Sequence, residues 1–277
     1  MNKKVWAILL CLVFLNLVSW SVVSYFYQNY LKVVFFDVGQ GDAIFIETPF
    51  KHQILIDGGP DRERIIEKLS EEMPFWDRTI DLIVLSHLEE DHVTGLLQVL
   101  KEYEVKNVLW NGLGESEEWK SLLEEEGAAI LQGHSFSASD VSFEVLNPLW
   151  GESESMNDSS IVLKMTYEDN SFLFTGDISS KREDEVAVDI DVLKVAHHGS
   201  KYSTSAEFLE KTTPKVAVIQ VGKNSYGHPA EEVLTRLNNS GIKILRNDID
   251  GSVKIVSDGK NLKIIKKRTY ELSNFQD

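Results

Sequence analysis

A short apolar run that ends in a cluster of metal-binding side chains constrains the fold most. The run Ile83–Leu85 suits a buried strand, and Ser86-His87-Leu88-Glu89-Glu90-Asp91-His92 follows it directly. Open α/β sheets keep their sites beyond the carboxyl ends of such strands. Imidazole and carboxylate at this density suit zinc or manganese. Taken alone, the cluster fits equally well a solvated turn that leads into a helix near 93–100, with Asp91 as its cap.

The same pattern recurs at four other strand ends. The predicted strands 53–56, 171–174, 191–196 and 215–221 lead to Asp57-Gly58-Gly59, Thr175-Gly176-Asp177, His197-His198-Gly199-Ser200 and Asn224-Ser225-Tyr226-Gly227-His228-Pro229. Each has an ordinary structural explanation: Asp177 as a helix cap, His197 and His198 as a buried pair, and His228 before Pro229 as a helix start. Five of the seven histidines nevertheless follow predicted strands. This clustering of histidines and aspartates at strand ends predicts one metal site.

The rest of the chain favours a single mixed domain. Other strands are expected over 32–38, 43–47, 105–110, 128–131, 141–146, 159–167, 242–245, 252–257 and 262–265, and helices over 61–72, 116–126 and 230–238. The segments 133–140 and 147–155 are expected to be surface loops. Asp42, between two glycines and a strand, is expected to be a turn residue.

The N-terminal segment 1–31 is set apart from the domain expected over 32–277. Lys3 and Lys4 precede an uncharged stretch, 5–31, that is long enough to span a bilayer. Its flanking lysines and aromatic residues predict a signal anchor with the domain outside the cytoplasm, or a cleaved signal peptide and a secreted domain. A buried core helix is the least favoured alternative. Because Cys11 is the only cysteine, a disulfide framework and a thiolate metal site are excluded.

The net charge of −16 argues against a broadly basic surface for nucleic acid. DNA binding draws much of its strength from lysine and arginine, so local basic groups would have to border the site. The candidates are Lys194, Lys201 and Lys223, with a C-terminal cluster of Lys263, Lys266, Lys267 and Arg268.

The order of these motifs resembles the metallo-β-lactamase fold superfamily, and within it most closely the extracellular domains of ComEC-type DNA-uptake proteins. The resemblance covers 32–267 and rests on Asp37-Val38-Gly39-Gln40-Gly41-Asp42-Ala43, Ile56-Asp57-Gly58-Gly59, Ser86-His87 through Asp91-His92, Phe174-Thr175-Gly176-Asp177, Leu193 through Ser200, and Tyr226-Gly227-His228-Pro229. It implies an α/β fold, the αββα sandwich, preceded by one N-terminal membrane-spanning or signal helix. A multi-pass channel is not part of this sequence, so the chain looks like a standalone member.

The resemblance also implies two divalent ions, manganese or zinc. Their ligands would be His87, Glu89, Asp91, His92, Asp177 and His197. His87 and Glu89 would hold the first ion, and Asp91 and His92 the second, with Asp177 between them. His197 is preferred to His198 because it lies nearer the strand. Asp57 and His198 would support the ligands from behind.

Two departures from the superfamily pattern stand out. Glu89 occupies the second histidine position of the HxHxDH motif, and a carboxylate there favours manganese or another oxygen-tolerant ion. The stretch Met156-Asn157-Asp158-Ser159-Ser160 stands where many members place a ligand histidine. Asp158 would then act as a weak ligand or a base.

These residues predict an extracytoplasmic metal-dependent hydrolase, a phosphodiesterase or nuclease that acts on DNA through water activated by two metals. Asp91, Asp158 and His228 would be catalytic, while Ser200, Asn224 and Tyr226 would bind substrate, with Tyr226 stacking on a base or sugar. The expected partners are nucleic acid or another phosphodiester, and the membrane; no protein partner is expected. One alternative is a hydrolase of lactams, lactones or thioesters. Another is a binding module that has lost catalysis, motivated by Glu89.

Overall fold

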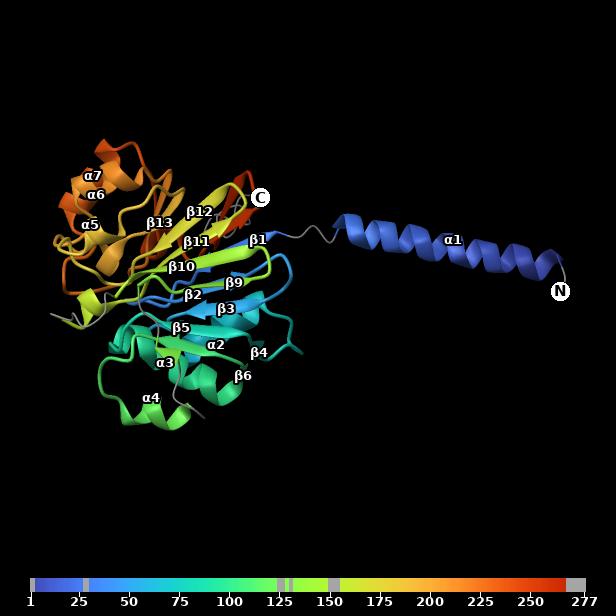
Figure 1. The fold of residues 1–277 in the computed structure, drawn as a ribbon, viewed down its shortest axis with the longest axis horizontal. Coiled ribbons are helices and arrows are strands. Elements are labelled where there is room, and N and C mark those ends of the chain that lie inside the picture. The colour runs from blue at the N-terminus through green and yellow to red at the C-terminus, as the bar shows by residue number, and fades with distance from the viewer. Residues whose placement is uncertain (1–2, 27–29, 124–127, 130–131, 149–154, 268–277) are drawn as a thin grey trace, which may run out of the picture.

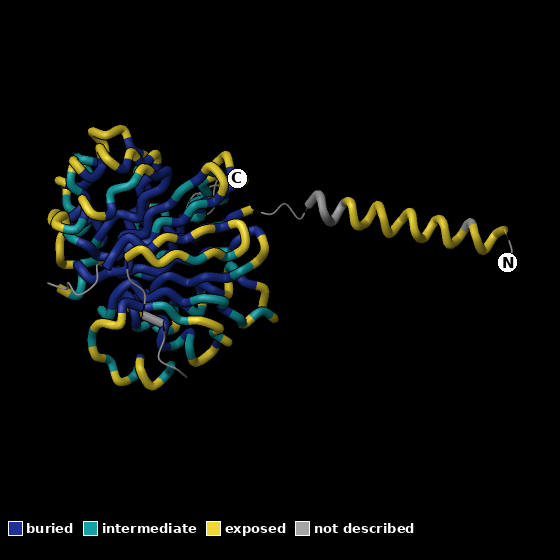
Figure 2. The backbone as a smooth tube through the Cα atoms, viewed as in Figure 1, coloured by how far each residue is buried: buried dark blue, intermediate teal, exposed yellow. Residues whose placement is uncertain are grey.

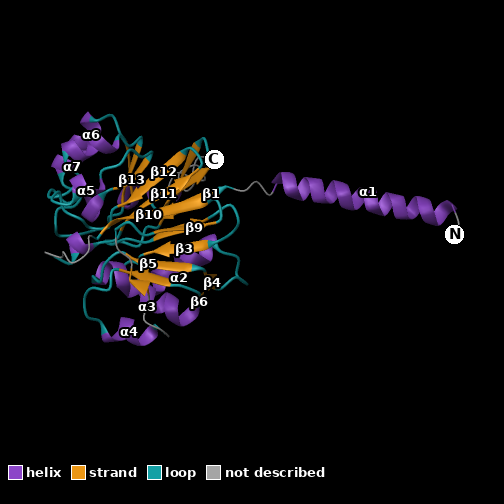
Figure 3. Ribbon diagram, viewed as in Figure 1, coloured by secondary structure: helices purple, strands orange, loops and turns teal. Residues whose placement is uncertain are grey.

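Two mixed sheets lie face to face, with helices on both outer faces (Figures 1 and 3). The computed structural model describes residues 3–26, 30–123, 128–129, 132–148 and 155–267. This arrangement confirms the predicted αββα sandwich.

The first sheet has the strand order β17-β16-β1-β2-β3-β5-β7-β8. Its strands are β1 (Leu31–Phe35), β2 (Ile44–Glu47), β3 (Gln53–Ile56), β5 (Leu82–Leu85), β7 (Val108–Trp110), β8 (Ala128–Ala129), β16 (Val253–Ser257) and β17 (Leu262–Lys266). Strands β3, β5, β7 and β8 run parallel. The helices packed on its outer face are α2 (Arg62–Glu72), α3 (Glu90–Glu102) and α4 (Glu117–Leu122). A separate pair is formed by β4 (Thr79–Ile80) and β6 (Glu104–Val105).

The second sheet has the order β15-β14-β13-β12-β11-β10-β9. Its strands are β9 (Ser135–Ala138), β10 (Val141–Asn147), β11 (Val162–Tyr167), β12 (Asn170–Phe174), β13 (Val192–Lys194), β14 (Val216–Ile219) and β15 (Lys243–Arg246). Strands β12 to β15 are parallel. The helices on this side are α5 (Glu183–Val186), α6 (Ala206–Thr212), α7 (Glu231–Asn239) and α8 (Asn247–Asp250), and two 3₁₀ turns are η1 (Asn157–Ser159) and η2 (Ala196–Gly199).

Alternation along the strands builds the core between the sheets. Val33 and Phe35 of β1 point into the space between the sheets, whereas Val34 points to the outer helices. The Phe35 ring lies 6.2 Å from that of Phe174 on the opposite sheet. In Figure 2 most of the inner strands are buried along their length, and β3, β13 and β14, in which every residue is buried, have largely apolar sequences, whereas β9 and β10 include exposed residues.

Some expected boundaries were wrong. The segment 133–140, expected to be a loop, contains the edge strand β9, whose serines alternate with half-buried Phe136 and Ala138 and so lack an apolar run. The expected strand 105–110 is divided between β6 and β7, and β1 ends at Phe35. Parts of the helix expected over 116–126 and of the strand expected over 128–131 lie outside the described residues.

Helix α1 (Lys3–Phe26) extends away from the sandwich (Figure 1). Its portion Lys3–Ser21 is long and apolar enough to cross a membrane, and none of it is buried; a signal sequence would meet the same criteria. The chain enters the sandwich at Leu31, the start of β1. The carboxyl ends of β3 and β5 lie at the opposite edge, because β1 runs antiparallel to β2 and β2 runs antiparallel to β3.

Candidate metal centre

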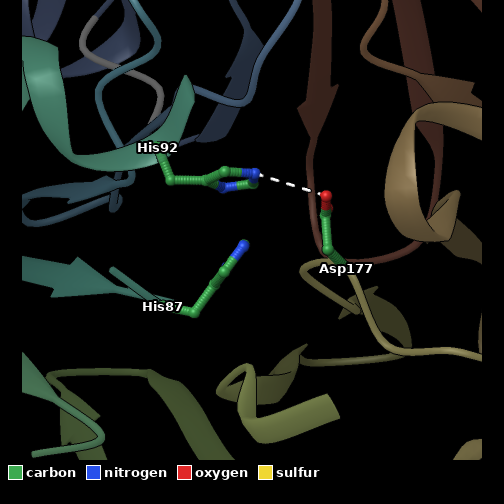
Figure 4. Close-up of side chains that lie close together, drawn as sticks. All are labelled: His87, His92 and Asp177. Atoms are coloured by element: carbon green, nitrogen blue, oxygen red, sulfur yellow. Dashed lines mark ion pairs between the residues drawn. The ribbon is translucent and has the colours of Figure 1, made fainter. Parts of the chain in front are cut away.

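The carboxyl ends of parallel strands from both sheets meet at one edge of the sandwich. In the first sheet, β3 delivers Asp57 and β5 delivers His87, while the first turn of α3 carries Asp91 and His92. In the second sheet, β12 delivers Asp177, and η2 carries His198. His87 and His92 point toward Asp177 (Figure 4), as the strand-end pattern predicted.

Three buried imidazoles are held in place through Nδ1 and direct Nε2 into the cluster. The Nδ1 of His92 lies 2.8 Å from Asp57 Oδ2, the Nδ1 of His198 lies 2.8 Å from the Gln220 carbonyl oxygen, and the Nδ1 of His87 lies 3.0 Å from Ser86 Oγ. These contacts assign the proton to Nδ1 and leave the Nε2 lone pairs for another partner. The Nε2 atoms of His87 and His92 are buried without any hydrogen-bond partner.

The inward nitrogens and two carboxylates form two overlapping donor sets. His87, His92 and Asp177 offer atoms within 4.8 Å of one another, and so do Asp91, His92 and His198. Asp177 Oδ2 lies 3.5 Å from His92 Nε2 and 3.4 Å from His198 Nε2. Unsatisfied buried nitrogens facing carboxylate oxygens are the donor set that divalent transition ions prefer, so the residues fit a metal centre.

Asp57 holds His92 and the turn after β5 in place. Its carboxylate accepts hydrogen bonds from the Ser86 backbone N–H at 2.7 Å, the Ser86 hydroxyl at 2.7 Å and His92 Nδ1 at 2.8 Å. With both oxygens engaged, Asp57 is placed behind the ligands rather than among them. This is the position expected from the sequence.

Glycines allow α3 to reach that position. A Cβ on Gly95 would lie 1.9 Å from the Gly58 carbonyl oxygen, and one on Gly58 would lie 2.4 Å from the Leu96 nitrogen. The Gly58 N–H donates to the His92 carbonyl oxygen at 2.8 Å. The paired glycines after β3 therefore bring the first turn of α3, with Asp91 and His92, against Asp57.

The structure reverses the expected order of the two adjacent histidines. His198 is buried and its Nε2 lies 3.2 Å from Asp91 Oδ2, whereas the His197 side chain is 32% exposed and its Nε2 lies 3.9 Å from Asp177 Oδ2. Both residues have left-handed backbone angles, with φ of 48° and 52°. This tight turn after β13 directs the second imidazole into the cluster and the first toward solvent, so the geometry favours His198 as the ligand.

Asp158, expected to be a weak ligand or a base, is not a member of the donor groups found among the described residues. Its Oδ1 accepts a hydrogen bond from the Ser179 backbone N–H at 2.8 Å, which fixes the turn after Asp177. Its neighbour Ser160 contacts the cluster instead. The Ser160 hydroxyl accepts from the Asp177 N–H at 3.0 Å and lies 3.3 Å from His87 Nδ1. Ser160 thus orients two ligands near the position where many family members carry a histidine.

Ser200 and Asn224 form hydrogen bonds within the loops that carry them. Ser200 is buried, and its hydroxyl accepts from the Tyr202 N–H at 3.4 Å. The Asn224 amide oxygen accepts from the backbone N–H groups of Tyr226 and His228, and its nitrogen donates to the Gly222 and His228 carbonyl oxygens. Asn224 also lines the pocket above the cluster, whereas Ser200 is not among the residues that line it. Contact of these two side chains with substrate stays a prediction.

The remaining predicted residues border a pocket that opens above the cluster. Glu89, His228, Tyr226 and Lys223 line this pocket together with Asp91 and Asp177. The Glu89 carboxylate lies 3.9 Å from His87 Nε2 on a side chain that is 42% exposed. Nδ1 of His228 is buried without a hydrogen-bond partner, and the Tyr226 side chain is exposed.

A buried ion pair beside the cluster is the feature that sequence reasoning missed. Lys194, the last residue of β13, forms an ion pair with Asp42, and its Nζ lies 2.8 Å from the Gly176 carbonyl oxygen and 3.4 Å from Asp177 Oδ1. Both side chains are almost fully buried. Lys194 therefore occupies one oxygen of Asp177 and leaves the other facing the imidazoles. The position of Lys194 in a buried strand is the sequence signal that could have indicated its burial. Lys194 is therefore not a rim residue, and Asp42 is a buried ion-pair partner as well as a turn residue.

Of the other lysines expected to border the site, Lys223 alone lines the pocket. Lys201 lies over the Tyr202 ring, Lys266 pairs with Asp250, and Lys267 pairs with Glu71. Arg268 lies outside the described residues.

Opposite charges dominate the electrostatics of the cluster. Burial disfavours the charged form of His198, but Asp177 and Asp42 outweigh it and raise the pKa of His198 to about 10. Burial likewise opposes the charge on His92, yet Asp177 and Asp57 raise its pKa well above the usual value. Burial and the charge on His92 lower the pKa of His87 to about 3. Two of the three imidazoles are therefore protonated at neutral pH until a cation displaces the protons.

The fold and the donor set define a metallo-hydrolase. The family model described as the metallo-beta-lactamase superfamily matches residues 36–223, and the chain belongs to this superfamily, whose fold binds divalent metals, typically two ions.

Similar proteins indicate to which branch of the superfamily the chain is related. The chain is 35% identical to ComE operon protein 3 of Bacillus subtilis, over 80% of this chain and 32% of that protein. It is 30% identical to competence protein ComA of Neisseria gonorrhoeae, over 98% of this chain and 38% of that protein. The chain thus spans about a third of the length of these ComEC-like relatives, which confirms the resemblance stated above. The Bacillus subtilis protein YhfI has the same fold, with a TM-score of 0.62 at 10% identity, over 83% of this chain and 100% of that one.

Proposed function

We propose that this chain is an extracytoplasmic metal-dependent phosphodiesterase that cleaves DNA. The observation that carries the proposal is the convergence of three buried Nε2 atoms on Asp177, each ring being held through Nδ1. Relatives named for competence support a DNA substrate. The membrane-crossing properties of α1 support a location at the outer face of the cell membrane.

The donor sets indicate which residues would hold two ions. Asp91, His92 and His198 would hold one ion. His87 would hold the other, with Glu89 moving in from the rim, and Asp177 Oδ2 would lie between them. Ions at such a site lower the pKa of water and neutralise charge on phosphoryl oxygens. Lys194 keeps Asp177 in the required orientation through its second oxygen. The carboxylate of Glu89 favours manganese over a strict preference for zinc.

The opposite wall of the pocket would hold the nucleic acid. His228 and Lys223 both line the pocket, where the imidazole offers a hydrogen bond to a phosphoryl oxygen and the lysine adds positive charge. The exposed Tyr226 ring, 5.8 Å from that of His228, offers a stacking surface for a base or sugar. Glu89 and Glu90 line the other side of the pocket and would repel a second phosphate backbone.

A cleavage assay tests the proposal. The full chain in detergent is incubated with single-stranded DNA, double-stranded DNA, an aryl phosphodiester, a lactam and a thioester, with manganese or zinc added. Cleavage of DNA and of the aryl diester that depends on the metal is expected. Hydrolysis of the lactam or thioester alone would show a metallo-hydrolase of non-phosphate substrates. Metal binding without any turnover would show a binding module.

Replacement of the two adjacent histidines is expected to have unequal effects. His198→Ala removes a buried ligand, and a loss of metal affinity of roughly a hundredfold is expected, as for other ligand changes. His197→Ala removes a partly exposed ring at 3.9 Å and is expected to change metal affinity only a few-fold. Titration calorimetry with manganese measures both. Equal losses in the two variants would refute the assignment of His198.

Metal binding is expected to release protons and to strengthen as the pH rises. His198, with a pKa of about 10, and His92, with a raised pKa, both carry a second ring proton at pH 7 that the metal must displace, whereas His87 is neutral and carries a single ring proton. Release of about two protons is therefore expected, with the affinity falling as the pH is lowered. Calorimetry in buffers that differ in ionisation enthalpy counts the protons. An affinity independent of pH between 6 and about 9 would contradict the proposed ligands.

A further inference from the structure

We propose that the edge of the sandwich nearest α1 rests on the bilayer, held there by exposed aromatic side chains on two loops. Phe75 and Trp76, between α2 and β4, are 84% and 73% exposed, and Phe50, between β2 and β3, is 60% exposed. The Phe75 and Trp76 rings pack against each other at 4.8 Å. Aromatic side chains this exposed contribute nothing to the core, and rings of this kind favour the interface between lipid and water.

Hydrogen bonds place the two loops side by side. The Gln53 backbone N–H donates to Asp81 at 2.8 Å, and the Gln53 side chain donates to Asp77 at 2.7 Å. Gln53 follows the loop with Phe50, and Asp77 follows Trp76 directly. The two aromatic tips therefore belong to one surface.

The same surface contains the start of β1. Lys32 Nζ lies 3.3 Å from the carbonyl oxygen of Glu72, at the end of α2, and 3.5 Å from Glu47, at the end of β2. Lys32 comes directly after Leu31, where the chain arrives from α1. In Figure 1 the loop between β2 and β3 and the loop before β4 accordingly lie on the side of the sandwich that faces α1.

The length of the connection keeps this surface close to the membrane. Helix α1 has 24 residues and is about 36 Å long, enough to cross the hydrocarbon core of a bilayer. From Phe26 to Leu31 the chain extends at most about 17 Å. If α1 crosses the bilayer, as the proposed location requires, the start of β1 and its neighbouring loops stay within reach of the lipid headgroups.

The charges on this edge favour a zwitterionic lipid surface. Near the aromatic loops, Lys51 pairs with Glu47, and Lys106 pairs with Asp81. The hairpin turns 139–140, 168–169 and 258–261 at this edge carry Asp140, Glu168, Asp169 and Asp258 against Lys260, and Lys215, before β14, pairs with Asp191. These acidic turns would be repelled by anionic lipids, so the contact depends on the aromatic rings.

This orientation turns the candidate metal centre away from the lipid. Strand β3 runs from Gln53, at the aromatic edge, to Ile56, beside Asp57, and β5 runs parallel to it. The pocket therefore opens on the side of the domain opposite the bilayer, where a DNA strand in the aqueous phase reaches it without crossing the headgroup region.

Depth-dependent quenching tests the contact in the full chain. Cys11→Ala removes the only cysteine, and Phe75→Cys then carries an environment-sensitive fluorophore in phosphatidylcholine nanodiscs. The matched control is Tyr202→Cys, at an aromatic residue that is 67% exposed and follows η2 at the metal edge. Lipids with a nitroxide near the headgroup are expected to remove most of the emission at position 75 and to leave that at position 202 unchanged.

Two further results decide between explanations. Trp76→Ser in a chain labelled at Phe50→Cys is expected to reduce the quenching at position 50, because the aromatic contact is shared. Equal quenching by the nitroxide lipid at positions 75 and 202 would overturn the proposal. A label at position 75 that is shielded from aqueous iodide but not quenched by the nitroxide lipid would also overturn it, because a protein would then cover this surface. Quenching without DNA cleavage would leave this inference standing and remove the proposed nuclease function; cleavage without quenching would do the reverse.

Discussion

Asp177→Asn is expected to reduce phosphodiester cleavage by at least about a thousandfold. Asp177 Oδ2 faces the inward nitrogens of both His92 and His198, at 3.5 and 3.4 Å. An amide removes the negative charge between the two donor sets while keeping the shape of the side chain. The measurement is the rate of cleavage of an aryl phosphodiester at saturating manganese.

Glu117→Gln provides the matched control for this charge change. Glu117 lies exposed in the first turn of α4 and takes no part in the donor sets of the described residues. Full activity is expected from this variant. An Asp177→Asn protein that stays folded and keeps more than about a tenth of the wild-type rate would exclude Asp177 as a shared metal ligand.

Lys194→Met is expected to destabilise the protein by about 3–5 kcal/mol. The substitution removes the buried lysine cation from the Asp42 carboxylate, which keeps only the His198 imidazole, 3.3 Å away, and it removes the contact with Asp177 Oδ1. A buried carboxylate that loses its ion-pair partner costs more than the original pair contributed. Chemical denaturation of the metal-free protein measures the free energy of unfolding.

The double variant Asp42→Asn with Lys194→Met separates the ion pair from general packing. Asp42→Asn removes the carboxylate charge that Lys194→Met leaves without its lysine. The double variant is therefore expected to be more stable than Lys194→Met alone, with a coupling energy of about 1–3 kcal/mol. Additive losses would mean that the two residues act independently. Metal affinity of the double variant is expected to stay reduced, because Asp177 has lost the group that orients it.

The position of the metal centre could be predicted because it follows from topology. His87 and Asp177 come directly after buried strands, and parallel strands present their carboxyl ends at one edge of a sheet. The apolar runs that mark these strands are visible in the sequence, and the two sheets bring their edges together. The fold class and the general location of the cluster therefore needed no side-chain detail.

The choice between His197 and His198 could not be predicted in the same way. Distance along the chain from β13 favours His197, but the left-handed turn at both residues decides which ring enters the cluster. The orientation of the Asp158 side chain depends on its hydrogen bond with the backbone of Ser179, 21 residues away, which no local pattern indicates. Lysines are rarely fully buried, and the partner that accompanies Lys194 into the interior, Asp42, lies far off in the sequence.

The most direct test of the central claim is the electron paramagnetic resonance spectrum of the protein loaded with manganese. Each chain is expected to bind two manganese ions close enough for their spins to couple, because the donor sets share His92 and because Asp177 Oδ2 also lies 3.4 Å from His198 Nε2. The coupled signal is expected to disappear in Asp177→Asn. A wild-type protein that binds no manganese, or only magnetically isolated ions, would contradict the two-metal site.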